Sequence, residues 1–335
     1  MTASDAAALR IRAPARLHLG FLDLGGALGR RFGSLGLTLD RPATQVTIAR
    51  AGTDSATGPD AGRAARARDA VRAALGIDAA FAITVDDALP AHGGLGSGTQ
   101  LAVAVGVGVA RLAGHALTVR QVAGLLGRGR RSAIGMEAFE AGGAILDGGK
   151  ALDGPDADAP PPLLARLPVP EEWRVLLVFD TAREGLSGSA EVEAMASLPP
   201  FPEALAAHLC HLMLLRALPA LAMGDAAVFG EVVGAWQRVL GDHYAAAQGG
   251  ARFLSAQVAQ AVAFIEAEGI GGVGQSSWGP TGFAIVGDAA TASRLLEALR
   301  RRFASSTNLT FDCVRGNNRG AEITALPQAR APQSA

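Results

Sequence analysis

The residues best suited to chemistry lie in a glycine-rich run at 93–100, with the sequence Gly-Gly-Leu-Gly-Ser-Gly-Thr-Gln. The run follows a predicted strand at 81–85 and leads directly into a helix of small residues predicted over 101–112. The first-turn amides of a helix lack an intrahelical partner and lie at the positive end of its dipole. The run therefore predicts a phosphate-binding loop. Its predicted binding residues are Gly93, Gly94, Leu95, Gly96, Ser97, Gly98, Thr99 and Gln100.

A simple tight turn is the alternative for any single glycine-rich loop. Here four glycines within six positions, the hydroxyls of Ser97 and Thr99, and the helix that follows at once favour phosphate binding. A second anion site is predicted at Arg130 and Arg131, with Arg128 as a further candidate, because a guanidinium matches phosphate bidentately. An arginine run is usually a solvated face, and the flanking glycines and turn leave the two interpretations about equal.

A third polar run lies near the C-terminus, at Gln275, Ser276, Ser277, Trp278 and Gly279. It combines an amide, two hydroxyls and an indole. These groups suit a pocket that has a polar end and a flat aromatic wall, for which Trp278 is the best candidate in the chain. A core tryptophan is the alternative, and the polar and glycine neighbours disfavour it.

The composition sets limits on the class of protein. The chain has 335 residues, of which 49% are hydrophobic, and this length favours two domains. A formal net charge of −1 gives no reason to expect nucleic acid or an anionic membrane as a partner. The two cysteines exclude a disulfide framework and favour the cytoplasm. We expect no signal peptide and no segment long enough to span a membrane.

Three motifs in order carry a resemblance to the GHMP kinase superfamily over most of the chain. They are the opening segment at 13–20, the glycine-rich loop, and the glycine-rich stretch at 272–282. The resemblance implies an α+β, two-domain GHMP-kinase-like fold. Its S5-like N-terminal domain would span 1–190 and its ferredoxin-like C-terminal domain 191–325, followed by a disordered tail at 326–335.

The chain departs from the kinase pattern where the kinases have an aspartate near the phosphoryl acceptor. The matching position is Gly135, and neither Glu137 nor Asp147 is in register with it. Kinases can act by positioning and electrostatics without a base, so this loss disfavours phosphoryl transfer without excluding it.

Taken together, the motifs are similar to one branch of the superfamily, the β-ribofuranosylaminobenzene 5′-phosphate synthases. The resemblance implies a decarboxylating phosphoribosyltransferase that joins phosphoribosyl diphosphate to 4-aminobenzoate in tetrahydromethanopterin biosynthesis. It leaves 4-hydroxybenzoate open as the acceptor. An ATP-dependent small-molecule kinase is the alternative function. The expected partners are these small molecules, with neither nucleic acid nor membrane, and a homodimer is the default assembly.

The implied reaction assigns roles to three residues of the opening segment. Arg16 and His18 alternate along a predicted strand and share a face, so both are predicted to be catalytic. His18 is a candidate to protonate a leaving oxygen or bind the benzoate carboxylate, with a structural histidine as the alternative. Asp23 is a candidate to hold Mg²⁺ on the diphosphate of the substrate. Whether any side chain binds Mg²⁺ directly stays open. A separate metal site at His208 and His211 is disfavoured, because no third ligand has a suitable spacing.

Overall fold

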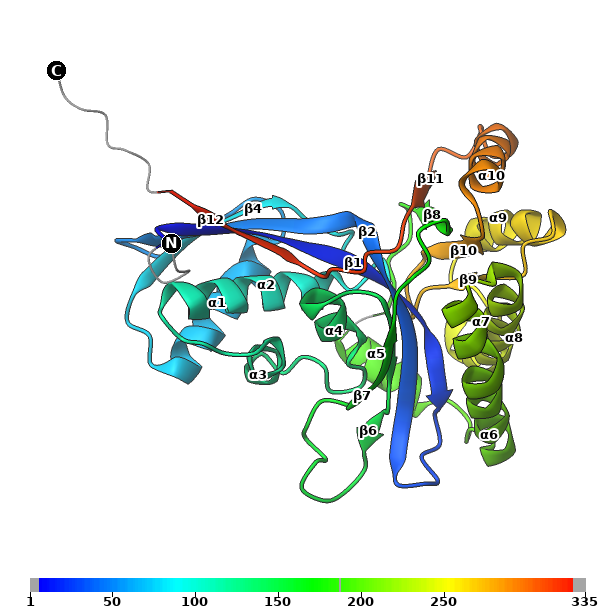
Figure 1. The fold of residues 1–335 in the computed structure, drawn as a ribbon, viewed down its shortest axis with the longest axis horizontal. Coiled ribbons are helices and arrows are strands. Elements are labelled where there is room, and N and C mark those ends of the chain that lie inside the picture. The colour runs from blue at the N-terminus through cyan, green and yellow to red at the C-terminus, as the bar shows by residue number, and fades with distance from the viewer. Residues whose placement is uncertain (1–5, 187, 328–335) are drawn as a thin grey trace.

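The computed structural model describes residues 6–186 and 188–327, in which two sheets organise the chain (Figure 1). The strands of the first sheet are β1 (Ala8–Asp23), β2 (Arg30–Ala51), β3 (Ser55–Thr57), β4 (Ala80–Asp87), β5 (Ala144–Asp147), β6 (Lys150–Ala151), β7 (Leu163–Leu167) and β12 (Glu322–Leu326). They are ordered β12-β1-β2-β4-β3, with β5 and β6 paired to β2 and β7 paired to β5. The second sheet has the order β11-β8-β10-β9, built from β8 (Arg174–Asp180), β9 (Val273–Gln275), β10 (Gly282–Val286) and β11 (Leu309–Val314).

The helices of the N-terminal half are α1 (Ala61–Leu75), α2 (Ser97–Leu112), α3 (Val119–Leu125), α4 (Ile134–Glu140) and α5 (Gly188–Ala196). Those of the C-terminal half are α6 (Glu203–Leu212), a π-helical turn at Met213–Ala217, α7 (Leu218–Met223), α8 (Ala226–Tyr244), a 3₁₀ turn at Ala245–Gln248, α9 (Ala256–Ala267) and α10 (Ala289–Arg302). The mixture of helices with two sheets agrees with the predicted α+β class.

Strand β1 continues through Pro14 without a break. Its pairing with β2 shifts register between Pro14 and Arg16 and again between His18 and Gly20. Such bulges let a strand pass an irregular residue without ending. Arg16 pairs with Thr38 and His18 with Gly36 without a shift between them, so both side chains share a face, as predicted.

Close backbone packing builds the core of the first sheet. Helix α2 consists largely of alanine, valine and glycine, and 12 of its residues are buried. A Cβ on Gly108 would lie 2.2 Å from the Cδ1 atom of Ile48 in β2, so glycine sets how closely the helix approaches the sheet. Such a core depends on the close approach of backbones more than on large side chains.

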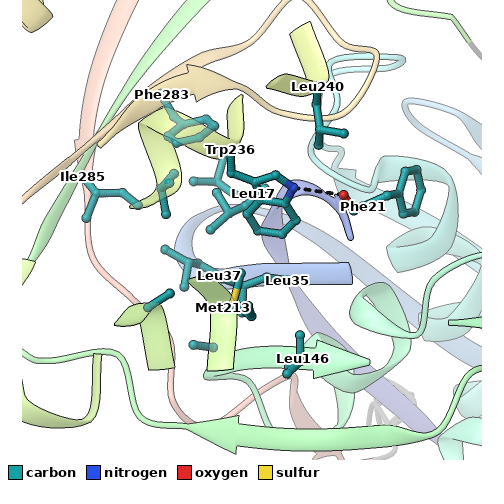
Figure 2. Packing of buried hydrophobic residues seen from close by; sticks show 14 of the residues in the cluster. Leu17, Phe21, Leu35, Leu37, Leu146, Met213, Trp236, Leu240, Phe283 and Ile285 are labelled. Carbon is teal, nitrogen blue, oxygen red and sulfur yellow. Dashed lines mark hydrogen bonds between the residues drawn. The ribbon is translucent and has the colours of Figure 1, made fainter. Parts of the chain in front are cut away.

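A second core joins the two sheets (Figure 2). Leu17, Leu35 and Leu37 of the first sheet cluster with Phe283 and Ile285 of the second. Helix α8 contributes Trp236, whose Nε1 donates a hydrogen bond of 2.9 Å to the backbone oxygen of Phe21. The bulged end of β1 is therefore held against α8.

The strands do not divide at the predicted boundary of residue 190. Strand β8 lies within 1–190 but pairs with β10 and β11 in the second sheet. Strand β12 lies after α10 but pairs with β1 in the first sheet. The pairing of strands that lie far apart in sequence leaves no local signal. A single boundary drawn along the sequence therefore could not assign β8 and β12 to their sheets. Leu326 ends β12, so the predicted tail starts too early; residues 328–335 of it lie outside the described part.

One helical stretch, Glu203–Met223, is long and apolar enough by length and composition to span a membrane, with a mean hydropathy of 1.5. The expectation that no segment reaches this length is wrong, because α6, the π-helical turn and α7 follow one another without a break. Pro219 lies near the start of α7 and does not interrupt the helical stretch. A third of the window is buried. Leu209, Met213, Ala217 and Leu221 from it belong to the core between the sheets.

Candidate active site

The three motifs singled out in the sequence meet at one carbonyl. The backbone oxygen of Gly94 accepts a hydrogen bond of 2.6 Å from Arg16 Nη1 and one of 2.7 Å from Ser276 Oγ. Ser276 Oγ in turn accepts from the backbone nitrogen of His18 at 3.0 Å. The opening strand, the glycine-rich loop and the C-terminal motif therefore form a single hydrogen-bonded unit.

A cavity of about 600 Å³ lies beside this unit. Its lining includes five residues of the predicted phosphate loop, namely Gly94, Gly96, Ser97, Gly98 and Thr99. Helix α2 begins at Ser97, four residues before the predicted start, and its N-cap is Gly96 in the left-handed region. Gly96 has no side chain to cap the first turn, so the amides of that turn, which lies in the cavity lining, have no side-chain acceptor. This is the geometry of an anion site at a helix N-terminus.

Three residues of the predicted loop do not line this cavity. Leu95 is fully buried in the core between the sheets. Gln100 is also buried, and its side-chain nitrogen donates to the oxygen of Gly135 at 2.7 Å. The oxygen of Gly93 accepts from Thr281 Oγ1 at 2.5 Å. These three residues hold the loop in place. They do not line the cavity in which phosphate binding was predicted.

The cavity is strongly cationic. Its charged lining residues are Arg16, Arg63, Arg66, Arg128, Arg131 and Glu191. Burial lowers the pKa of Arg16 to about 10, partly opposed by Glu191, so the guanidinium stays charged at neutral pH. Glu191 forms an ion pair with Arg131 at 2.9 Å. Within the described lining, arginines outnumber carboxylates by five to one, which suits a ligand carrying several negative charges.

Sequence reasoning missed two of these arginines and assigned phosphate binding to one arginine that does not line the cavity. Arg63 and Arg66 lie on α1 beside Ala67 and Ala70, spaced as neighbours on one helix face. That spacing, with small residues completing the face, was a signal the sequence held. Arg130, which was predicted to bind phosphate, is exposed and does not line the cavity. It lies in an irregular turn after Gly129, whose φ of 78° turns the chain so that Arg128 and Arg131 line the cavity instead.

The acidic residues near the kinase aspartate position are engaged elsewhere. Glu137 forms ion pairs with Arg120 at 3.0 Å and Arg166 at 2.5 Å. Asp147 is buried and accepts hydrogen bonds from backbone nitrogens, including that of Ala133 at 2.8 Å. A Cβ on Gly135 would lie 2.9 Å from the Cγ2 atom of Thr99, which leaves no room for a carboxylate without a shift. Neither Glu137 nor Asp147 lines the cavity.

Known proteins share both the sequence and the fold that build this cavity. The chain matches family models for the GHMP kinases N terminal domain over residues 62–143 and the GHMP kinases C terminal over 217–305. It is 32% identical over 329 residues to the β-ribofuranosylphenol 5′-phosphate synthase of Archaeoglobus fulgidus, covering 94% of this chain and 99% of that one. The enzyme of the same name from Methanothermobacter thermautotrophicus is 34% identical over 244 residues, covering 67% and 74%. The chain belongs to this synthase family.

Solved structures show the same fold at lower identity. A homoserine kinase from Cytophaga hutchinsonii superposes with a TM-score of 0.63 at 17% identity, covering 96% of this chain and 98% of that one. A mevalonate diphosphate decarboxylase from Staphylococcus aureus gives 0.64 at 15% identity, covering 95% and 98%. These structures agree with the predicted fold, and the family models together with the curated relatives confirm the predicted superfamily and synthase branch.

Two residues that we predicted to be catalytic lie outside the cavity of about 600 Å³. His18 is 4% exposed and lines a separate cavity. Burial, followed by the charges of Arg16 and Arg131, lowers its pKa to about 3, so its imidazole is neutral at physiological pH. Asp23 Oδ1 accepts from the backbone nitrogens of Gly25 at 2.7 Å and Gly26 at 3.0 Å, and thus caps a turn. In this structure His18 is a neutral side chain outside the larger cavity. Asp23 caps a turn and does not line that cavity.

The buried neutral His18 makes a prediction about acid stability. Below pH 6.5 the unfolded chain protonates this histidine, whereas the folded chain does not until near pH 3. Stability therefore falls as the pH falls through this window. We expect acidification from pH 7 to pH 5 to lower the unfolding free energy of the wild type by about 2 kcal/mol more than that of His18→Gln. Urea titrations at both pH values measure the difference, and equal losses in both proteins would contradict it.

The C-terminal motif divides its residues between two tasks. Ser277, Trp278 and Gly279 line the cavity of about 600 Å³. Gln275 and Ser276 do not: Gln275 Oε1 accepts from the backbone nitrogen of Leu254 at 2.7 Å, and Ser276 bonds the loop. Trp278 is 3% exposed and its ring centre lies 4.4 Å from that of Tyr244. It therefore offers the cleft less flat surface than the sequence predicted.

The donor set in the cleft fits a shared metal ion better than a protein-held one. No group of three or more histidine, cysteine, aspartate or glutamate side chains able to hold a metal occurs within residues 6–186 and 188–327. The oxygen donors of the cavity lining are Glu191, already paired with Arg131, and the hydroxyls of Ser97, Thr99 and Ser277. Mg²⁺ commonly takes one or two protein oxygens and completes its shell with substrate phosphates and water.

Proposed function

We propose that the chain is a decarboxylating phosphoribosyltransferase. It joins phosphoribosyl diphosphate to 4-aminobenzoate and gives β-ribofuranosylaminobenzene 5′-phosphate, CO₂ and diphosphate. The observation that carries this proposal is the cleft, in which a helix N-terminus and five arginines surround about 600 Å³ beside Trp278. The names of the curated relatives, synthases of a ribofuranosylphenol 5′-phosphate, support the same type of reaction.

The sugar donor has an anionic group at each end, and the cleft has two groups of anion-binding elements. The first turn of α2 and Arg16 form one, at the glycine-rich loop. Arg63 and Arg66 of α1 form the other, while Arg128 lies beside the first turn of α2, with Nη1 3.7 Å from the position of a Cβ on Gly98. A preorganised positive field also stabilises charge that develops on the leaving diphosphate as its bond to the sugar breaks. Mg²⁺ would arrive with the diphosphate and neutralise part of its charge, with Glu191 and the nearby hydroxyls as protein ligands.

The chemistry of this transfer explains why the cleft can lack a kinase-type aspartate. The ring carbon that bears the carboxylate attacks C1 of the ribose, and the bond from C1 to diphosphate breaks with its electron pair. The electron pair of the bond to the carboxylate then returns to the ring as CO₂ leaves. No proton has to be removed from the attacking carbon, whereas the acceptor hydroxyl of a kinase must lose one. Gly135 at the aspartate position is consistent with this difference.

The wider setting belongs to the same proposal. The product would serve tetrahydromethanopterin biosynthesis in the cytoplasm, and the enzyme would act on small molecules alone, as a homodimer. The acceptor has a second candidate, 4-hydroxybenzoate, because the phenol in the relatives' names would derive from it.

Release of CO₂ from carboxyl-labelled acceptor tests the proposal. The protein is incubated with labelled 4-aminobenzoate or 4-hydroxybenzoate, Mg²⁺, and either phosphoribosyl diphosphate or ATP. We expect labelled CO₂ only with phosphoribosyl diphosphate, and the faster acceptor identifies the substrate. ATP-dependent phosphorylation of an alcohol, without CO₂ from either acid, would overturn the proposal.

A further inference from the structure

A second cavity of about 20 Å³ adjoins the cleft and shares Ser277 and Trp278 with it. Its volume is enough for one group the size of a water molecule. His18, Phe21 and Tyr244 also line it, on strand β1 and at the end of α8. The cavity is thus built from the C-terminal motif, the opening strand and the helix that holds that strand through Trp236.

Three polar side chains of this cavity are buried without a hydrogen-bond partner in the described part of the chain. The atoms are both ring nitrogens of His18, the hydroxyl of Tyr244 and Nε1 of Trp278. Within residues 6–186 and 188–327, seven residues carry such atoms. Three of the seven line this one small cavity. Because a buried unpaired polar group is unfavourable, each such group calls for a partner that the chain does not supply.

The chemistry of the lining defines what that partner must be. Burial lowers the pKa of His18 and raises that of Tyr244, so both are neutral at physiological pH. The rings of Phe21 and His18 meet at 4.6 Å between centroids and form an apolar wall (Figure 2 shows Phe21). Arg252 also reaches the lining, but its guanidinium is engaged by Asp242 at 3.0 Å. Such a lining accepts an uncharged group that can both donate and accept hydrogen bonds.

We infer that this cavity binds the para substituent of the aromatic acid, with His18 and Tyr244 as its hydrogen-bond partners, while the ring stays in the cleft beside Trp278. The inference rests on the proposed function and names the residues that recognise the acceptor. An amino or hydroxyl group fits both the size of the cavity and its neutral polar lining. The neutral lining offers no charge to balance a carboxylate, whereas five arginines line the cleft, so the acid group of the substrate stays in the cleft.

A contact at the para position would also act on the reaction. When the ring carbon attacks, electron density flows from the para nitrogen or oxygen into the ring, and positive charge develops on that atom. Its N–H or O–H becomes more acidic, so a hydrogen bond to the neutral imidazole of His18 strengthens in the transition state. The proton stays bonded to the para substituent and is only hydrogen-bonded to the imidazole of His18. No net proton transfer is needed.

The test compares 4-aminobenzoate with benzoate, which lacks only the para group. Dissociation constants are measured by calorimetry with ribose 5-phosphate and diphosphate present, so that no turnover occurs. The variants are Tyr244→Phe, which removes one hydroxyl, and His18→Gln. Thr38→Val is the matched control, since Thr38 Oγ1 is also buried without a described partner but lines neither cavity.

We expect the wild type and Thr38→Val to bind 4-aminobenzoate about tenfold more tightly than benzoate, and each cavity variant to lose most of that preference. A wild type without the preference, or cavity variants that keep it, would overturn the inference and leave a cavity that holds structural water. These binding ratios do not depend on turnover. Failure of CO₂ release would therefore count against the proposed function, and an unchanged ratio against this inference alone.

Discussion

Replacement of Arg16 by glutamine is expected to lower kcat/KM for phosphoribosyl diphosphate by roughly 10²- to 10³-fold. Arg16 lines the cleft and at the same time donates a 2.6 Å hydrogen bond to Gly94. Its loss would remove a half-buried charge from the anion site and one of the two side-chain donors to the loop carbonyl. Truncation of a hydrogen-bonded charge in a desolvated site costs about 2–5 kcal/mol, and the expected change lies within that range.

Two controls separate binding from folding in this experiment. Arg16→Lys keeps the charge but not the forked geometry, so we expect an intermediate loss. Arg130→Gln removes an exposed arginine that does not line the cleft and should stay within about twofold of the wild type. Urea unfolding shows whether Arg16→Gln is still folded. Equal losses in the Arg16 and Arg130 variants would refute the assignment of Arg16 to the anion site.

The features that the sequence predicted well are those with a local cause. A strand, a glycine-rich turn and a helix of small residues occupy one continuous segment, and the loop at Gly94–Thr99 formed as expected. The family resemblance then supplied the fold, because the three motifs occur in the order of the superfamily. The residues Arg63 and Arg66 were also within reach, since they mark one face of α1 with Ala67 and Ala70.

The features that the sequence could not predict depend on which segments of the chain cross in space. Arg16 and His18 share a face of β1, as alternation requires, yet they line different cavities. The C-terminal motif separates them, since Ser276 bonds the backbone of His18 and Trp278 lines both cavities. Nothing within residues 13–23 indicates this crossing. The catalytic roles predicted for His18 and Asp23 stay predictions, since the crossing places His18 at the smaller cavity and Asp23 caps a turn.

The second large effect is expected at Gly279, where two backbones touch. A Cβ on Gly279 would lie 2.3 Å from the backbone nitrogen of Gly94 and 2.5 Å from the oxygen of Gly93. Backbone atoms of a hydrogen-bonded loop cannot move aside as the end of a side chain can. We expect Gly279→Ala to lower the unfolding free energy by about 3 kcal/mol, near the upper end for overpacking, and to abolish the binding of phosphoribosyl diphosphate.

Gly124→Ala provides the matched control. Gly124 lies in α3 without a left-handed φ, and an alanine Cβ there would have no neighbouring atom within 4 Å. At this position alanine should be neutral or stabilise by about 0.5–1 kcal/mol. Chemical denaturation and calorimetric titration with phosphoribosyl diphosphate measure both quantities. A Gly279→Ala protein as stable as the control, with normal affinity, would show that the two loops do not depend on each other.

The same contact can be broken from its other side. Gly94 has a φ of 81°, and a Cβ there would lie 2.2 Å from the backbone oxygen of Ser276. If the glycine-rich loop and the C-terminal motif form one unit, Gly94→Ala and Gly279→Ala damage one and the same contact. The double variant should then be less destabilised than the sum of the two single variants. Additive losses would mean that the anion site and the aromatic side of the cleft are assembled independently.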